Sequence, residues 1–179
     1  MRRRRRLLAL ESPDAAELAA QALPLEDLPT FTIFGAYRAQ GAEMDPAPVI
    51  GRLTDAGAAL SLPAATARDA PLAYRMTQAG QTLVLDAFGI PAPPPNAPPV
   101  APQLILAPVL AFDAKGGRLG QGAGAFDRTL QALRAAGPLF VVGLAYAGQE
   151  VDHAAFDDHD EPLDAILTER GYRVFPKET

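Results

Sequence analysis

The order of apolar and glycine-rich segments in the second half of the chain constrains its fold most strongly. Residues 103–112 and 138–146 are almost continuously apolar, which predicts strands that are covered on both faces, as in an α/β sheet. Between them, residues 127–137 carry Leu130 and Leu133 at helical spacing and end in a glycine, which predicts a helix. Strand, glycine-rich loop, helix and strand form a βαβ unit, in which ligands bind near the carboxyl ends of the strands.

The remaining sequence predicts further short elements around this unit. The apolar spacing from Leu7 to Leu23 predicts one or two short helices, divided near Ser12 and Pro13. A further helix is predicted at 46–57, and strands are predicted at 31–37, 58–63, 72–77 and 82–89. Residues 91–102 contain seven prolines, which predicts an extended connector. We favour a stiff surface strap over a proline-rich ligand for a partner protein.

The composition favours one cytoplasmic domain that acts on a small molecule. A chain of 179 residues with 49% hydrophobic content can bury one full core, so we expect a single domain over residues 1–179. The net charge of −5 argues against nucleic acid as a partner, and the absence of cysteine excludes disulfides and cysteine-bound zinc. The apolar run Leu7–Leu10 is too short for a secretion signal, and no later run is long enough to cross a membrane. We therefore expect a soluble, cytoplasmic monomer.

Five glycines crowd the loop between the apolar run and the helix: Gly116, Gly117, Gly120, Gly122 and Gly124. Glycines let backbone N–H groups approach an anion, and the following helix adds the positive end of its dipole. Arg118 offers a forked cation for phosphate, and Lys115 offers a point charge. The loop has neither the Gly-Lys-Ser/Thr ending of a Walker loop nor the dinucleotide fingerprint. A phosphate site and a plain tight connection therefore both stay open.

Residues 108–130, PVLAFDAKGGRLGQGAGAFDRTL, resemble the signature of the 5-formyltetrahydrofolate cyclo-ligases, also called methenyltetrahydrofolate synthetases. Further resemblances follow in order at 37–50, 62–63, 88–93 and 159–169, so that the similarity extends from about Phe31 onward. Together with the βαβ pattern, the resemblance implies an α/β fold. We expect a single-domain three-layer αβα sandwich with a mostly parallel, Rossmann-like central sheet.

The resemblance also implies a reaction, namely ATP-dependent conversion of 5-formyltetrahydrofolate to 5,10-methenyltetrahydrofolate with release of ADP and phosphate. Phosphorylation of the formyl oxygen would create an imino-phosphate, which the neighbouring folate nitrogen displaces by ring closure. In such phosphoryl transfer the protein mainly positions the reactants and neutralises charge. The implied cofactor is Mg²⁺, and the implied partners are ATP and 5-formyltetrahydrofolate.

The same resemblance implies roles for individual residues. Arg118 would stabilise the charge that develops during transfer, and Asp127 and Asp160 would hold Mg²⁺. Glu43 would accept hydrogen bonds from the pterin, and the folate cleft would also include Tyr37 and Arg38. The loop around the ATP phosphates would consist of Arg118, Leu119, Gly120, Gln121, Gly122, Ala123, Gly124, Ala125 and Phe126.

Simpler interpretations of several of these residues stay open. Asp127 stands where a helix N-cap would, and its spacing alone favours capping. Asp160 belongs to an acidic run at 157–161 that could be merely solvated. We assign no catalytic role to His153 or His159, because a single histidine in such a loop is more often a surface residue.

The chain departs from the family pattern in two places. Family members usually begin with a longer basic helix, whose Lys-x-x-x-Arg pair touches ATP and substrate, and here that helix looks shortened. Arg2 and Arg6 have the one-turn spacing of this pair, so they are candidates for ATP contacts or else solvated residues. Gln121 and Ala125 stand where aromatics are common, and Phe126 replaces a tyrosine, which removes a hydroxyl group.

Two other functions stay as alternatives to the enzyme. A non-catalytic folate- or nucleotide-binding protein on the same scaffold would explain the shortened helix and the missing hydroxyl. A sugar-phosphate enzyme with a related sheet is the third possibility, since a fold alone does not fix chemistry. That third possibility leaves the resemblance at 159–169 unexplained.

Overall fold

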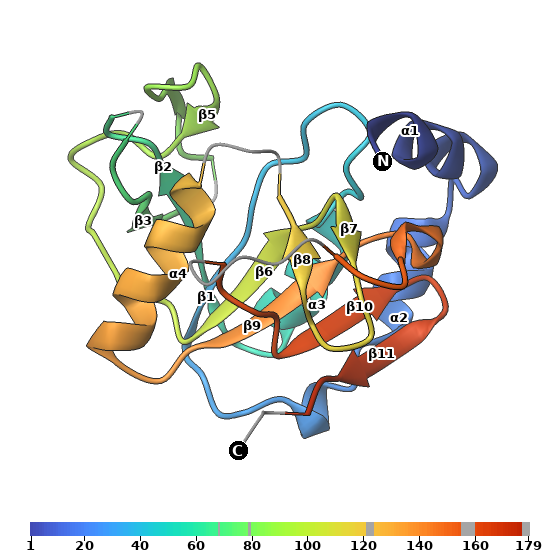
Figure 1. Cartoon of the computed structure of the whole chain (residues 1–179). Helices are drawn as coiled ribbons and strands as arrows, with labels where there is room; N and C mark the ends of the chain where they lie inside the picture. Colours follow the sequence, from blue (N-terminus) through green and yellow to red (C-terminus); the bar gives the residue numbers. More distant parts are fainter. Residues whose placement is uncertain (68, 79, 121–123, 155–159, 177–179) are drawn as a thin grey trace.

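The computed structural model describes residues 1–67, 69–78, 80–120, 124–154 and 160–176 (Figure 1). The helices are α1 (Arg2–Glu11), α2 (Ala15–Ala22), α3 (Ala47–Asp55) and α4 (Ala125–Ala136), with short 3₁₀ turns η1 (Leu25–Asp27) and η2 (Ala147–Gln149). The large sheet contains β1 (Ile33–Gly35), β2 (Ala59–Ala64), β3 (Ala73–Met76), β6 (Leu104–Pro108), β9 (Phe140–Leu144), β10 (Ala165–Thr168) and β11 (Gly171–Val174). Two small hairpins pair β4 (Val84–Leu85) with β5 (Pro91–Ala92) and β7 (Ala111–Phe112) with β8 (Arg118–Leu119).

The large sheet is parallel at its centre and antiparallel at its two edges. Its strand order is β11-β10-β9-β6-β1-β2-β3, and only the pairs β2–β3 and β10–β11 run antiparallel. β6 and β9 are parallel neighbours, with Ile105 beside Val141, and α4 connects them. The predicted βαβ unit is therefore confirmed, and so is the mostly parallel sheet.

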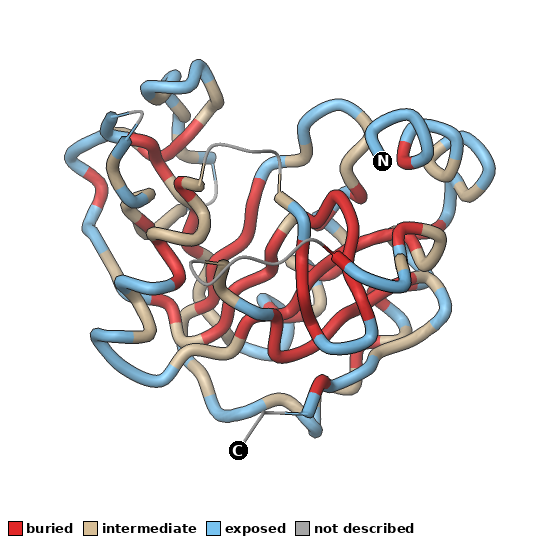
Figure 2. The backbone as a smooth tube through the Cα atoms, in the orientation of Figure 1, coloured by how far each residue is buried: buried red, intermediate tan, exposed pale blue. Residues whose placement is uncertain are grey.

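Side chains alternate between two cores on opposite faces of this sheet. On β6, Leu104 and Leu106 belong to the core that includes α2 and α3, whereas Ile105 and Ala107 belong to the core beneath α4. Figure 1 shows α4 in front of the sheet and α3 behind it, and Figure 2 shows the central strands buried. This double coverage explains why the strands read as continuous apolar runs, and it confirms the three-layer αβα prediction.

Some boundaries differ from the predictions for physical reasons. The apolar run 103–112 divides after Pro108, because Ala111–Phe112 leave the large sheet and pair with β8 instead. The predicted strand 82–89 shrinks to β4, because the chain turns at Gly89, whose φ of 75° is left-handed. The hairpin β10–β11 was not predicted as secondary structure.

The proline-rich segment 91–102 lies along the edge of the sheet, as the surface-strap prediction requires. Met76 N donates to Pro98 O at 3.0 Å, and Val100 N donates to Tyr74 O at 3.0 Å. The strap thus occupies backbone groups of edge strand β3, which would otherwise be open to another strand. Within the described part of the chain, no helix is both long enough and apolar enough to cross a membrane. The cytoplasmic location and the monomeric state stay predictions.

Candidate active site

A cavity of about 610 Å³ opens at the carboxyl ends of β1, β2 and β6, where Pro63 and Pro108 form part of its wall. The chain order reverses direction between the neighbours β1 and β6, and such switch points are where open α/β sheets bind ligands. The cavity brings together the predicted residues Tyr37, Arg38, Glu43, Arg118, Leu119, Gly120, Gly124, Ala125, Phe126, Asp127 and Asp160. The predicted residues Gln121, Gly122 and Ala123 lie outside the described part of the chain.

The first two glycines of the loop shape a tight hairpin away from this cavity. The Asp113 carboxylate accepts N–H bonds from Lys115 and Gly117 at 2.9 Å, which closes the turn between β7 and β8. Gly116 has a φ of 87°, and a Cβ there would lie 2.8 Å from the Leu163 carbonyl oxygen. At Gly117 a Cβ would lie 2.7 Å from an Asp113 oxygen. These glycines therefore serve the tight connection that the sequence left open.

The later part of the loop delivers the amino terminus of α4 to the cavity. Gly124 is the N-cap, with a left-handed φ of 61° and no side-chain hydrogen bond to the helix end. The first helical turn, Ala125 to Asp127, lines the cavity, so its backbone N–H groups and the positive end of the helix dipole lie there. This arrangement suits an anion.

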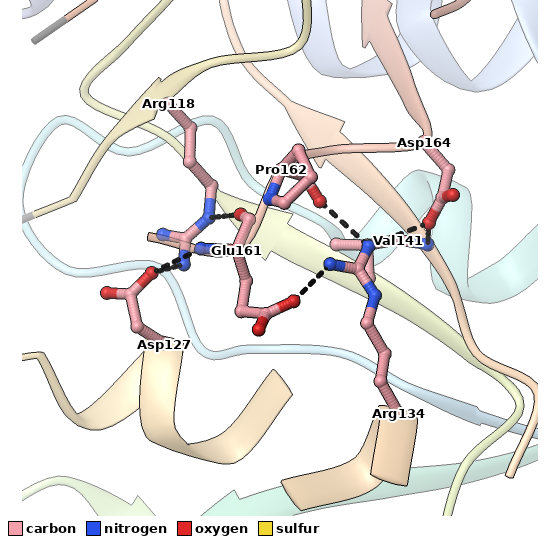
Figure 3. A network of polar contacts seen from close by, with 7 residues as sticks. All are labelled: Arg118, Asp127, Arg134, Val141, Glu161, Pro162 and Asp164. Carbon is pink, nitrogen blue, oxygen red and sulfur yellow. Dashed lines mark hydrogen bonds and ion pairs between the residues drawn. The ribbon is translucent and has the colours of Figure 1, made fainter. Parts of the chain in front are cut away.

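Asp127 does not cap the helix, so the capping interpretation was wrong. α4 begins at Ala125, which places Asp127 inside the first turn. Its Oδ1 accepts hydrogen bonds from the Arg118 guanidinium and, at 3.2 Å, from the Glu161 N–H (Figure 3). Both bonds use the same oxygen of the carboxylate.

Arg118 lines the cavity although only 3% of its surface is exposed. Several contacts hold its guanidinium in place. Its Nη2 donates to Asp127, its Nε donates to the Glu161 carbonyl oxygen at 3.1 Å, and its guanidinium lies 5.3 Å from the centre of the Phe126 ring. Burial lowers the pKa of Arg118, and the charges of Asp127 and Asp160 act in the opposite direction. Arginine remains a cation in such settings, so the site holds a fixed positive charge.

The two predicted magnesium ligands lie in the same cavity. Asp127 comes from α4 and Asp160 comes from the segment before β10, and both carboxylates act electrostatically on Arg118. Among the described residues, no group of three or more metal-binding side chains occurs. Two carboxylates without a full protein cage fit Mg²⁺, which usually keeps waters and bridges phosphate oxygens.

The cavity lining also contains a carboxylate whose side chain is almost fully buried. Glu43 accepts the Gln40 N–H at 2.8 Å, and its side chain is 6% exposed. Arg5 Nη1 lies 3.6 Å from Glu43 Oε1, and the Arg5 side chain is 7% exposed. Nearby, the Tyr37 hydroxyl donates to the Met44 carbonyl oxygen at 2.5 Å. Burial, followed by the charge of Glu43, raises the pKa of Tyr37 well above its ordinary value, which keeps the phenol neutral.

The structure places Arg5, rather than Arg2 or Arg6, beside Glu43. Arg2 and Arg6 are exposed, and none of the three arginines lines the cavity. A signal for Arg5 existed, because Leu8 and Ala9 lie one turn further along the same face of α1 and pack against the core. Within the described residues, Nε and Nη1 of Arg5 are buried and have no hydrogen-bond partner.

Sequence analysis also missed an apolar wall that the turn after β4 contributes. Asp86 Oδ1 accepts the N–H groups of Phe88 and Ile90, both at 2.9 Å, and its Oδ2 accepts the Ala65 N–H at 2.9 Å. This network fixes the turn and places Phe88 and Ile90 in the cavity lining. The segment had been predicted as a strand, which hid this role.

The other charged candidates lie elsewhere. Lys115 lines a second cavity of about 660 Å³, together with Asp113 and Arg134, and it does not line the first one. His153 has 81% of its side chain exposed, which fits the surface position expected from sequence, and His159 lies outside the described residues.

Comparisons with known proteins show which family the chain resembles. A model of the 5-formyltetrahydrofolate cyclo-ligase family matches residues 1–169. The 5-formyltetrahydrofolate cyclo-ligase of Mycolicibacterium smegmatis is 34% identical over 141 residues, which cover 74% of this chain and 71% of that protein. The protein of the same name from Escherichia coli is 32% identical over 131 residues, covering 70% of this chain and 71% of that protein.

Two solved structures share the fold. The 5,10-methenyltetrahydrofolate synthetase of Aquifex aeolicus aligns with a TM-score of 0.72 and 23% identity over 99% of this chain and 93% of that one. The synthetase of Mycoplasma pneumoniae aligns with a TM-score of 0.67 and 20% identity over 94% of this chain and 93% of that one. With the family model matching nearly the whole chain, this protein belongs to the 5-formyltetrahydrofolate cyclo-ligase family.

Proposed function

We propose that this chain catalyses the ATP-dependent cyclisation of 5-formyltetrahydrofolate to 5,10-methenyltetrahydrofolate, with release of ADP and phosphate. The observation that carries the proposal is that two chemically different sets of residues line one cavity. Arg118, Asp127 and Asp160 form one set, to which the amino terminus of α4 adds its N–H groups, and Glu43 and Tyr37 from the segment after β1 form the other. The first set suits a triphosphate, and the second suits a pterin.

At the phosphate end, Arg118 is the proposed catalytic residue. The formyl oxygen attacks the γ-phosphorus of ATP, and ADP leaves. Arg118 faces the charge that develops in this step, and its position is fixed before the substrates arrive because Asp127 and Glu161 already hold its guanidinium. The N–H groups of the first turn of α4 add further donors for phosphate oxygens. The folate nitrogen N10 then attacks the formyl carbon, and phosphate leaves with the formyl oxygen.

Asp127 and Asp160 are the proposed ligands of Mg²⁺. Carboxylates outnumber guanidinium groups among the described lining residues, with Glu43, Asp86, Asp127 and Asp160 against Arg38 and Arg118. Polyanionic ATP would be repelled by such a wall without an additional cation. Mg²⁺ would supply that charge, and the carboxylates of Asp127 and Asp160 would hold it in the cavity that Arg118 also lines.

At the pterin end, Glu43 would accept hydrogen bonds from the N–H groups of the ring. Arg5 lies beside its carboxylate and the Gln40 N–H donates to it, so the acceptor is held in place before the substrate binds. Tyr37 and Arg38 lie in the same part of the lining. Phe88 and Ile90 supply apolar surface for the flat faces of the ligand rings.

Turnover of the purified chain tests the proposal. We expect methenyl product, followed by its absorbance, when the protein is mixed with 5-formyltetrahydrofolate, ATP and Mg²⁺, and no product when ATP is omitted. Calorimetric binding of 5-formyltetrahydrofolate without any turnover would contradict the enzyme and would favour a non-catalytic folate-binding protein instead.

A further inference from the structure

The described segment 160–164 carries Asp160 to the cavity, and backbone hydrogen bonds hold it at its far end. There, Leu163 N donates to Gly116 O at 2.9 Å, and Asp164 N donates to Val141 O at 2.9 Å. Val141 N also donates to the Asp164 carboxylate at 2.9 Å, so β9 holds that residue from two sides. Closer to the cavity, the contacts of Glu161, the neighbour of Asp160, also hold this segment.

Two of the three groups that hold Glu161 belong to the proposed phosphate site itself. The Glu161 N–H donates to Asp127 at 3.2 Å, and its carbonyl oxygen accepts from Arg118 at 3.1 Å. Both residues also belong to the proposed phosphate site, so these two bonds come from the site itself. An anchor that lies outside the site would hold the segment independently of the ligands.

Arg134 is that anchor, as Figure 3 shows. It lies on α4 about two turns beyond Asp127, outside the first cavity. Its Nη1 donates to the Glu161 carboxylate, and its Nη2 donates to Pro162 O at 2.8 Å and to Asp164 Oδ2 at 3.1 Å. Among the described residues, no other side chain from outside the first cavity contacts Glu161.

The burial of this contact makes it more than a solvated surface pair. The side chains of Arg134, Glu161 and Asp164 are 25%, 20% and 8% exposed. One planar guanidinium joins three acceptors on one short segment, which a flexible point charge could not do at the same time. Because α4 carries both Asp127 and Arg134, the same rigid helix sets the position of one proposed ligand and of the segment that carries the other.

We infer that Arg134 is a positioning residue, which fixes Asp160 relative to Asp127 and thereby sets the affinity of the site for Mg²⁺. The inference rests on the proposed function, because it takes these two aspartates as the cation site. Residues that orient metal ligands from outside typically change metal affinity about 10- to 100-fold when they are replaced. Arg134 should therefore act on the Mg²⁺ requirement rather than on folate binding.

The test compares Arg134→Ala and Arg134→Lys with Gln131→Ala, an exposed position on the same helix. We expect Arg134→Ala to raise the Mg²⁺ concentration for half-maximal activity about tenfold or more. The KM for 5-formyltetrahydrofolate should stay within about twofold of that of the unmodified chain, since this substrate binds at the Glu43 end. Arg134→Lys should recover part of the loss, and Gln131→Ala should behave like the unmodified chain. A loss of kcat with an unchanged Mg²⁺ requirement would overturn the inference.

A second readout does not depend on turnover. In the presence of ADP, Mg²⁺ should raise the Tm of the unmodified chain, and the same Tm increase should need about tenfold more Mg²⁺ in Arg134→Ala. Glu161→Gln keeps the backbone bonds of residue 161 and weakens only the contact with Arg134, so it should shift the Mg²⁺ titration in the same direction if Arg134→Ala folds poorly. Identical titrations for Glu161→Gln and the unmodified chain would contradict the positioning role. Failure of the unmodified chain to turn over would instead count against the proposed function, while these titrations would still test Arg134.

Discussion

At the scale of single residues, the site depends on charged side chains that are held before any ligand arrives. Arg118 is almost fully buried, yet its partners are all acceptors, so its charge is retained and its orientation is fixed. Glu43 is a comparable case at the other end of the cavity, where Arg5 balances its charge. Preorganised charges of this kind stabilise a transition state without reorganising during the reaction.

The first prediction concerns Arg118→Lys. A lysine keeps the positive charge but cannot bind Asp127 and the Glu161 carbonyl oxygen as a fork while it also faces phosphate. We expect kcat to fall by about 100-fold or more, which is the usual loss for one well-placed transition-state donor. Steady-state kinetics with thermal unfolding as a control measure this. A kcat near that of the unmodified chain would remove Arg118 from the catalytic step.

The second prediction distinguishes Arg5 from its neighbour in the run of arginines. Arg5→Met should destabilise the chain by about 3 kcal/mol, because it leaves the buried Glu43 carboxylate without the cation beside it. It should also raise the KM for 5-formyltetrahydrofolate by about tenfold, through displacement of Glu43. Arg6→Met is the matched control, since Arg6 is exposed and does not line the cavity. Urea unfolding and substrate titration should show no change in that control, and equal effects of both variants would contradict the role of Arg5.

At the scale of elements, the hairpin β7–β8 connects a tight turn to the proposed catalytic arginine, Arg118, which begins β8. Asp113 accepts three backbone N–H groups, those of Lys115, Gly117 and Ala154, and so fixes the turn that precedes Arg118. Burial raises the pKa of Asp113, but these three hydrogen bonds and the charge of His153 together outweigh it and lower the pKa below its ordinary value. The hairpin is therefore held by an ionised carboxylate.

The third prediction follows from the sign of this shift. A carboxyl whose pKa is lowered by folding stabilises the chain above its ordinary pKa, and this contribution disappears as the pH falls through the folded-state pKa. Asp113→Asn should cost about 1–3 kcal/mol at pH 7, because a neutral amide cannot accept all three bonds. Below about pH 4 the difference from the unmodified chain should shrink. Urea unfolding at several pH values measures both effects, and a pH-independent difference would contradict this account.

The same elements show how far the sequence predicts the structure. The unit β6–α4–β9 was predicted because buried parallel strands leave long apolar runs, and α4 has Leu130 buried on one face. β7 and β8 were missed, because two-residue strands carry no period, and their pairing is fixed by Asp113 and backbone bonds. The edge strand β11 was also missed, because a short, half-buried strand carries no clear period.

The residues of the candidate site were predicted mainly through the family resemblance. The residues that this prediction omitted owe their roles to tertiary packing. Whether Arg5 or Arg6 is buried depends on how α1 packs, with Leu8 against Gly148. Asp127 appeared as a helix cap because the start of α4 cannot be located within a loop of glycines and alanines. No feature of the sequence indicated the contacts of Arg134, because they are made by a segment far along the chain that folds back onto α4.

At the scale of the whole molecule, the charge of the protein bears on whether a nucleotide would bind alone or together with Mg²⁺. The chain carries a net charge of −5, and the described lining of the cavity also has more carboxylates than guanidinium groups. At the proposed phosphate site, attraction of a polyanion would therefore rely on the α4 terminus, Arg118 and the proposed Mg²⁺. The fold places the α4 terminus and Arg118 in the cavity at the switch point between β1 and β6, where strands from the two halves of the chain meet.

The fourth prediction is that removal of Mg²⁺ abolishes nucleotide binding. With EDTA present, ATP should leave the Tm unchanged and give no calorimetric signal, whereas saturating Mg²⁺ with ATP should raise the Tm. Asp160→Asn distinguishes two possible roles of Asp160, which are ligation of the cation and repulsion of phosphate. The variant loses both the negative charge and the carboxylate ligand, and the two roles predict opposite changes in nucleotide binding. If Asp160 holds the cation, binding in Mg²⁺ weakens in this variant. If Asp160 only repels phosphate, binding strengthens with or without Mg²⁺, and that second outcome would exclude it as a ligand.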